Sequence, residues 1–214
     1  MDKKNSIVYI IDDDAEIRKS LSLQLKSAGY QAESFSSIDK LLETDDYNGA
    51  GCILLDVFLG GKTGLELQAD IETKFESLPI IYISGHGDIP MSVEALKKGA
   101  INFLQKPIDE EKLFSAIDEA INKSNEIIQK YSQLEKFKSV VSSLSAREYE
   151  IFRYVITGMI NKQIALELGI AEHTVKNHRL KITEKLGVKS VAEMVYMAEK
   201  LNIKAADVKN ISLK

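Results

Sequence analysis

The sequence predicts two domains of different class, a doubly wound α/β domain with a five-stranded parallel sheet and then an all-α domain of four helices. Short apolar runs alternate with helical patterns through the first half, which is typical of βαβ units. From about residue 143 onward only helical patterns remain, and cap residues or glycines bound them.

Polar residues follow the apolar runs of the first half. These runs and the residues after them are 7–11 with Asp12, Asp13 and Asp14, 52–55 with Asp56, 80–83 with Ser84, and 101–104 with Lys106. Because the carboxyl ends of parallel strands share one edge of a sheet, we expect these side chains to converge in one crevice. Carboxylates, a hydroxyl and an ammonium group at one place predict a site for a hard cation and a phosphoryl group.

Helical patterns follow the strands at about 15–28, 37–44, 64–75, 88–98 and from 109 onward. Gly29 and Gly99 stand where two of these helices should end. Strands separated by helices of this length predict a parallel sheet with right-handed crossovers.

The helix that starts near 109 continues beyond the α/β repeat. Apolar residues recur at spacings of three, four and seven from Leu113 to Val141, with no glycine or proline between them. A stripe of this kind usually packs on its own domain, but residues beyond about 122 lie outside the repeat. We therefore divide the chain into an α/β domain (1–122), a helical linker able to pair with a partner chain (123–142), and a helical domain (143–214).

The second half contains patterns for helices from Ser145 to near Gly158, at 161–168, at 172–186, and from Ser190 to about Leu201. A tight glycine-containing turn joins the second and third of these helices, and the third is rich in basic residues. This pattern is typical of a helix-turn-helix that binds DNA. A plain helical bundle with a solvated basic face is the alternative.

Charge is divided unevenly along the chain, although the net charge is only −4. Residues 1–125 hold 22 acidic and 13 basic side chains, whereas residues 126–214 hold 10 acidic and 15 basic ones. The basic half favours a nucleic-acid partner. No apolar stretch approaches the roughly 18 residues of a membrane span, and no signal peptide is recognisable. We therefore expect a cytoplasmic protein with no membrane association, in which Cys52 is a buried, inert thiol.

These motifs together resemble the two-component response regulators of the NarL/FixJ type, in which a CheY-like, flavodoxin-like receiver is joined to a LuxR-type helix-turn-helix. The residues that carry the resemblance are 10–14, 54–56, 84–88, 97–100 and 103–107 in the first half, and 144–148, 161–165 and 174–178 in the second. Residues 84–88 are similar to the FixJ-like branch in particular.

The chemistry expected of the first domain is phosphorylation of Asp56. A carboxylate can attack phosphorus, but it repels a phosphoryl donor, so a bridging divalent cation is needed. We expect Mg²⁺, held by Asp13 and Asp56 directly and by Asp12 partly through water. The resemblance adds the Phe58 carbonyl as a further ligand.

Three further residues are expected to sense the phosphoryl group. Lys106 would supply a compact positive charge to its oxygens, and the Ser84 hydroxyl would donate to another of them. Phe103 stands where the resemblance places a rotating aromatic ring, which would fill the space that Ser84 vacates. Phosphorylation would then expose a dimerisation face and release the helical domain to bind DNA.

The DNA-binding residues are expected in the third helix of the second domain: Thr174, Val175, Lys176, Asn177, His178, Arg179 and Lys185. By resemblance, Lys176 and Asn177 would contact bases, while Thr174, His178 and Lys185 would contact phosphates. Val175 lies seven residues before Ile182, a spacing that also fits a side chain packed inward.

The predicted function is therefore a transcription regulator, not an enzyme, that Mg²⁺-dependent phosphorylation of Asp56 activates. The expected partners are a sensor histidine kinase, double-stranded promoter DNA, RNA polymerase and, after phosphorylation, a second copy of the chain. The alternative is a signalling protein whose helical domain binds another protein. Two departures from the family pattern are Gly60 and Gly61, in place of a usual proline beside Asp56, and Ala171, in place of a usual serine.

Overall fold

A computed structural model describes residues 5–45, 47, 49–59, 62–64, 68–85 and 89–207 of the chain. The chain divides into two compact units, Met1–Gln129 and Lys130–Lys214, here called the α/β unit and the helical unit. None of the described helices is both long and apolar enough to cross a membrane.

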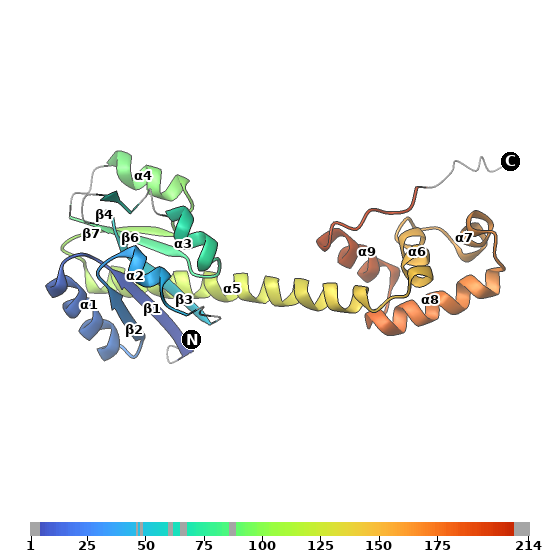
Figure 1. Cartoon of the computed structure of the whole chain (residues 1–214), viewed down its shortest axis with the longest axis horizontal. Coiled ribbons are helices and arrows are strands. Elements are labelled where there is room, and N and C mark those ends of the chain that lie inside the picture. The colour runs from blue at the N-terminus through green and yellow to red at the C-terminus, as the bar shows by residue number, and fades with distance from the viewer. Residues whose placement is uncertain are drawn as a thin grey trace. The chain divides into compact units, whose positions relative to one another are not determined.

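The α/β unit contains a five-stranded parallel sheet in the order β2-β1-β3-β6-β7 (Figure 1). The strands are β1 (Ser6–Ile11), β2 (Gln31–Phe35), β3 (Ala50–Asp56), β6 (Ile80–Ser84) and β7 (Asn102–Gln105). In register, Asp56 lies beside Ile83 and Ser84 beside Gln105, so the carboxyl ends of the central strands meet at one edge. The predicted doubly wound sheet is confirmed.

One small feature of this unit was not predicted. Directly after β3 the chain forms β4 (Phe58–Leu59) and β5 (Lys62–Thr63), which pair in antiparallel fashion. Thr63 therefore lies in a strand, and the described part of the next helix, α3, is Gln68–Lys74. Residues 65–67, in the first part of the predicted helix 64–75, lie outside the described residues. The Gly60-Gly61 departure lies outside the described residues.

Helices cover both faces of the sheet because successive strand side chains point to opposite sides (Figure 1). Val8, Ile10 and Leu54 pack against α1 (Ala15–Ser27) and the first half of α5 (Glu110–Ser142). The strand residues that point to the other side, among them Ile7, Tyr9 and Tyr82, pack with α2 (Ile38–Leu42), α3 and α4 (Ile89–Lys97). The three inner strands β1, β3 and β6 are buried on both faces, as parallel strands in such folds are.

Helix α5 is continuous across the predicted linker. Its first half belongs to the α/β unit, where it is buried as far as Ser124, whose hydroxyl oxygen accepts a hydrogen bond from the Gly51 amide at 3.1 Å. Its last turns belong to the helical unit, where the Phe137 ring packs edge-on against Tyr196 with ring centroids 6.2 Å apart. The chain therefore changes units within this helix.

The described part of the helical unit continues with four short helices, as predicted: α6 (Ala146–Val155), α7 (Asn161–Leu168), α8 (Glu172–Leu186) and α9 (Val191–Lys200). They surround a core that includes Ile151, Phe152, Ile164, Ile182 and Met197. Gly169 and Gly187 end α7 and α8 in the left-handed conformation that glycine adopts most readily.

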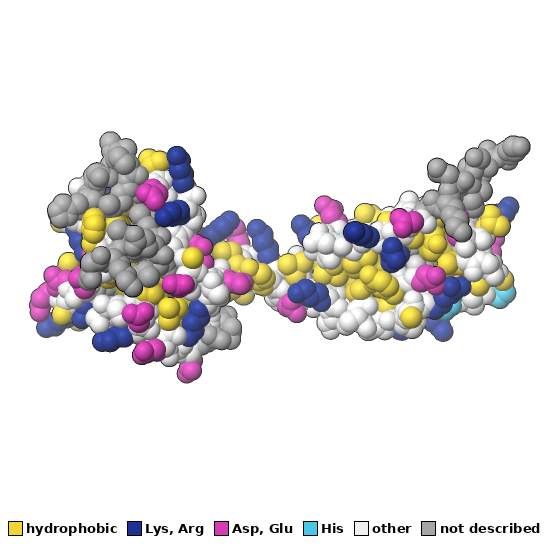
Figure 2. All heavy atoms as spheres, turned by 45° about the horizontal axis from the view of Figure 1, so that its top comes forward, with side chains coloured by type: hydrophobic (Ala, Val, Ile, Leu, Met, Phe, Trp, Pro, Cys, Tyr) yellow, Lys and Arg dark blue, Asp and Glu magenta, His cyan; other side chains and the backbone are white. Residues whose placement is uncertain are grey.

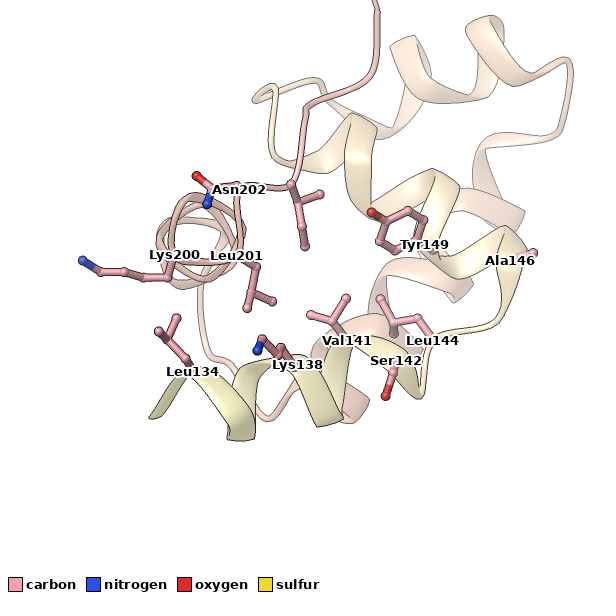
Figure 3. Close-up of a pocket in the computed structure, with 11 residues that line it drawn as sticks. Leu134, Lys138, Val141, Ser142, Leu144, Ala146, Tyr149, Lys200, Leu201 and Asn202 are labelled. Atoms are coloured by element: carbon pink, nitrogen blue, oxygen red, sulfur yellow. The ribbon is translucent and has the colours of Figure 1, made fainter. Parts of the chain in front are cut away.

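A pocket of about 690 Å³ lies within the helical unit, between the last turns of α5, the start of α6 and the end of α9 (Figure 3). Leu134 and Val141 project into it from α5, Tyr149 from α6, and Leu201 from the end of α9. The last turns of α5 thus pack as part of the helical unit and are not a linker without contacts.

Candidate metal centre and nucleic-acid interface

Three carboxylates gather where β1 and β3 end. Asp12 follows β1 directly and Asp56 is the last residue of β3. Each of Asp12, Asp13 and Asp56 places a carboxylate oxygen within 4.8 Å of the others, which is the arrangement that a shared cation requires. Asp12 and Asp56 are buried, whereas Asp13 is exposed, so the acidic cluster opens to solvent on the Asp13 side.

Lys106 joins two members of this cluster. Its Nζ donates hydrogen bonds to Oδ2 of Asp12 at 2.7 Å and to Oδ2 of Asp56 at 2.5 Å. Burial by itself would lower the pKa of Lys106, but the bonds to the two carboxylates outweigh this effect and its pKa is raised. Burial raises the pKa of Asp12, and the bond from Lys106 opposes this rise. The ammonium thus occupies the position of the positive charge that two buried carboxylates need.

Backbone amides hold the other oxygens of the same two carboxylates. The Asp14 amide donates to Oδ1 of Asp12 at 2.8 Å, and the Phe58 amide donates to Oδ1 of Asp56 at 3.0 Å. Asp14 itself caps α1 by accepting from the amides of Glu16 and Ile17. The turns after β1 and β3 therefore set the orientation of both carboxylates before any ligand binds.

Ser84 and Phe103 lie on the next two strands of the sheet. Ser84 ends β6 and is fully buried, one residue beyond the partner of Asp56, and its carbonyl accepts from the Lys106 amide at 2.8 Å. Phe103 lies beside Tyr82 and is half-buried against the core. A cavity of about 520 Å³, lined by residues 103–109 and Lys112, borders the Phe103 ring. Phe103 therefore forms part of the wall of this cavity.

In the helical unit, α8 exposes a single charged and polar face. Its inward positions Val175, Ile182 and Leu186 are buried. The exposed residues of this helix are Glu172, His173, Lys176, Asn177, Leu180, Lys181, Glu184 and Lys185. Cyan histidine atoms of this helix lie beside dark-blue lysine or arginine atoms in Figure 2. A basic face on the second helix of a helix-turn-helix is typical of DNA binding.

Arg179 connects this helix to the start of α7. Its Nη1 donates to the Met159 carbonyl at 3.2 Å and to Oδ1 of Asn161 at 3.0 Å. A groove of about 510 Å³ runs beside it, lined by Ile160, Asn161, Lys176, Asn177, Arg179, Leu180 and Thr183. The Arg179 side chain thereby holds α8 against the start of α7, beside this groove.

Comparisons with known families agree with both sites. Residues 8–118 match the family described as the response regulator receiver domain, and residues 142–198 match the family described as bacterial regulatory proteins, luxR family. The chain belongs to the NarL/FixJ-type response regulators.

Several relatives match nearly the whole length of this chain. The response regulator protein TmoT of Ectopseudomonas mendocina is 41% identical over 94% of this chain and 91% of its own length. The transcriptional regulatory protein FixJ of Bradyrhizobium diazoefficiens is 34% identical over 89% and 93%, respectively. The structure of the response regulator StyR covers 92% of this chain and 99% of its own, with 41% identity and a TM-score of 0.79.

This membership establishes a DNA-binding regulator of a two-component system, which is not an enzyme. It does not favour the alternative of a protein-binding helical domain. Receiver domains bind Mg²⁺ in an acidic pocket, and in this response regulator Asp12, Asp13 and Asp56 form such a pocket. Residues 86–88, part of the motif that points to the FixJ-like branch, lie outside the described residues.

The structure brings Asp12, Asp13, Asp56 and Lys106 together, and on α8 it buries one of the predicted DNA contacts and engages two others within the protein. Val175 is fully buried in the helical core, so it cannot contact DNA, in agreement with its spacing from Ile182. Lys185 Nζ donates to Oε2 of Glu148 at 2.6 Å and to the Ser143 carbonyl at 3.3 Å, and is thus engaged within the protein. Arg179 is engaged in the same way with Met159 and Asn161.

The exposed residues of α8 that were not among the predicted contacts include Leu180 and Lys181. Leu180 and Lys181 follow Lys176 and Asn177 by four positions, one turn further along the exposed face. The helical spacing was available in the sequence and could have identified them. His178 is half-buried, and its Nδ1 is buried without a hydrogen-bond partner, so only the other ring nitrogen can reach a phosphate.

Proposed function

We propose that this response regulator is phosphorylated on Asp56 by a sensor histidine kinase and that Mg²⁺ bound to Asp12, Asp13, Asp56 and the Phe58 carbonyl supports the reaction. The observation that carries this proposal is the pair of short bonds from Lys106 to Asp12 and Asp56 at the end of the sheet. Bound there, the cation would neutralise the repulsion between the acceptor carboxylate and the phosphoryl donor.

The transfer itself would use an oxygen of Asp56 as the nucleophile. This oxygen forms a bond to phosphorus while the bond from phosphorus to the kinase histidine nitrogen breaks, and the electron pair stays on that nitrogen. Lys106 would then leave Oδ2 of Asp56 for the phosphoryl oxygens, which carry more charge. The Ser84 hydroxyl would donate to another phosphoryl oxygen from the end of the neighbouring strand.

Transmission of the signal would follow from the same residues. Movement of Ser84 toward the phosphoryl group would vacate space beside Phe103, whose ring already borders a cavity. The inward ring position would then be stabilised, and the population would shift toward a state that forms a homodimer. Residues 1–122 would act as the receiver, 123–142 as a helical linker, and 143–214 as the DNA-binding part.

We propose that the start of α8 enters the major groove of promoter DNA. Lys176 and Asn177 are exposed on its first turns and would contact bases. Thr174 and His178, which flank them and are half-exposed, would contact phosphates. Because Lys185 is paired with Glu148, we infer that it supports the position of α8 and does not contact a phosphate. A regulator bound at a promoter in the cytoplasm would then recruit or block RNA polymerase.

Mass spectrometry tests the phosphorylation proposal directly. The full-length protein treated with Mg²⁺ and acetyl phosphate should gain one labile phosphate, and the Asp56→Asn variant should gain none. Asp39→Asn, which changes an exposed acid on α2, is the matched control and should be labelled like the wild type. Labelling at full stoichiometry in Asp56→Asn, or labelling that is unchanged by a chelator, would show the proposal to be wrong.

A further inference from the structure

Leu180 is an exposed apolar side chain in the middle of a polar surface. Its exposed fraction is 61%, although it lies on the exposed face of α8 between Asn177 and Glu184. The inward face of the same helix is already complete with Val175, Ile182 and Leu186, so Leu180 contributes nothing to the core. Leu180 therefore offers an apolar group in the middle of this polar face to any surface that covers the face.

The position of Leu180 relative to the proposed base contacts indicates what that surface is. Lys176 lies one helical turn before it, and both residues line the same groove of about 510 Å³. Ile160, which precedes the first residue of α7 and is also 61% exposed, lines this groove as well. The groove thus combines two apolar side chains with an amine, a guanidinium, two amides and a hydroxyl.

We propose that Leu180 determines sequence specificity by contacting the 5-methyl group of a thymine in the major groove. This inference rests on the proposed docking of α8 in that groove. Among the groups at the edges of base pairs in the major groove, the thymine methyl is the apolar one, and side chains recognise it by apolar contact. A leucine one turn beyond the residues that contact the first bases would therefore select a T·A or A·T pair at a neighbouring position.

The size of the effect follows from the area that one methyl group buries. Burial of one such group between Leu180 and the base changes affinity about fourfold. Loss of the leucine removes this contact and leaves the lysine and amide contacts in place. Selection for thymine at one position should therefore disappear while DNA binding itself persists.

The experiment removes the proposed contact either from the protein, by replacing Leu180, or from the DNA, by removing the thymine methyl group. Duplexes are first selected from a random library with the full-length protein in Mg²⁺ and beryllium fluoride. Each thymine of the enriched site is then replaced singly by deoxyuridine, which lacks only the methyl group. Dissociation constants are measured at one salt concentration for the wild type, Leu180→Ala, and Leu166→Ala, an equally exposed leucine on α7 that does not line the groove.

At one thymine position of each half-site, the wild type and Leu166→Ala should lose about fourfold in affinity with deoxyuridine. Leu180→Ala should show no such loss at that position. Selection repeated with Leu180→Lys should enrich guanine there, because lysine donates to its O6 and N7 atoms. Circular dichroism should show the three variants to be folded, since both leucines are exposed.

Two outcomes would overturn the proposal, and they differ in what they leave standing. If a site is enriched but Leu180→Ala keeps the wild-type sensitivity to every thymine methyl, the leucine contact is wrong and the docking of α8 stands. If no sequence is enriched by any of the proteins, the DNA-binding role of α8 is wrong and the leucine contact is wrong with it.

Discussion

Glu148 of α6 and Lys185 of α8 form an ion pair, 2.6 Å from Oε2 to Nζ, in which the carboxylate side chain is buried and the ammonium side chain is partly exposed. The same Oε2 accepts the backbone amide of Ser145 at 2.8 Å and completes the capping box of α6. The Glu148 carboxylate thus caps the N-terminus of α6 and also holds α8 against α6. The DNA-binding helix owes its position in part to a residue 37 positions earlier in the chain.

This pair predicts how the stability of the helical unit depends on pH. The bond from Lys185, and after it the Ser145 amide, lowers the pKa of Glu148 from 4.5 to about 2. The unfolded chain binds a proton on this residue near pH 4.5, while the folded chain stays ionised until near pH 2. The stability that the pair contributes is therefore complete above about pH 4.5 and is lost as the pH falls toward 2.

Thermal unfolding of the full-length protein checks this prediction. Glu148→Gln should lower the melting temperature of the helical unit at pH 6, and its difference from the wild type should narrow steadily between pH 5 and pH 3. Glu150→Gln breaks the exposed pair with Arg147 and should change little at any pH. A constant difference between Glu148→Gln and the wild type over this range would contradict the assignment.

Removal of the Lys106 charge should strengthen Mg²⁺ binding. The ammonium contacts two of the carboxylates proposed to hold the cation and repels it, so Lys106→Met should bind Mg²⁺ about tenfold more tightly. Isothermal titration calorimetry of the full-length variants measures this directly. Lys112→Met, on an exposed lysine of the neighbouring helix, should bind like the wild type. If Lys106→Met binds Mg²⁺ no more tightly than the wild type does, the Lys106 ammonium does not compete with Mg²⁺ for the carboxylates.

Phe103 should separate phosphorylation from its consequence. Phe103→Ala leaves the acidic cluster and Lys106 unchanged, so acetyl phosphate should still label Asp56. Without the ring, movement of Ser84 has no aromatic partner, and beryllium fluoride should no longer shift the protein toward a dimer in sedimentation velocity. A normal shift to dimer in Phe103→Ala would show that the signal passes by another route.

The convergence of Asp56 and Lys106 could be predicted from the sequence because it follows from topology. Parallel strands that end in polar residues bring those residues to one edge, whatever the details of packing. The β4–β5 pair could not be predicted, since two residues in each strand are too few to form a pattern. The sequence left two roles open for Val175. Its place in the first turns of the helix predicted a contact with DNA, whereas its spacing of seven from Ile182 predicted a place in the core.

Lys185 shows the limit of such reasoning most clearly. A basic residue on a DNA-binding helix is a reasonable phosphate contact when only its own helix is considered. Its actual partner, Glu148, lies on another helix and was visible in the sequence only as half of a capping box. Ion pairs between distant residues depend on the packed structure, so charge along one helix does not reveal which lysines remain available for DNA.

A further prediction concerns the base contact of Lys176. As an exposed donor on the first turns of α8, it should contribute about 1–3 kcal/mol to discrimination at one base position. Lys176→Ala should therefore bring the affinities for the selected site and for scrambled DNA closer together. Binding isotherms on both duplexes measure this ratio, and an unchanged ratio would exclude Lys176 as a base contact.

Lys185 and Lys181 separate structural from DNA-binding lysines on α8. Lys185→Met breaks the pair with Glu148 and leaves a buried carboxylate without its cation, so the helical unit should melt at a lower temperature. Lys181→Met changes a lysine on the exposed face and should leave the melting temperature unchanged.

In DNA binding the two variants should behave in the opposite way, because a lysine that contacts a phosphate releases about one counterion. Lys181→Met should flatten the dependence of affinity on salt by about one ion, and Lys185→Met should leave that slope close to the wild-type value. Isotherms at several salt concentrations decide the matter: a slope reduced by Lys185→Met but not by Lys181→Met would restore Lys185 as a phosphate contact.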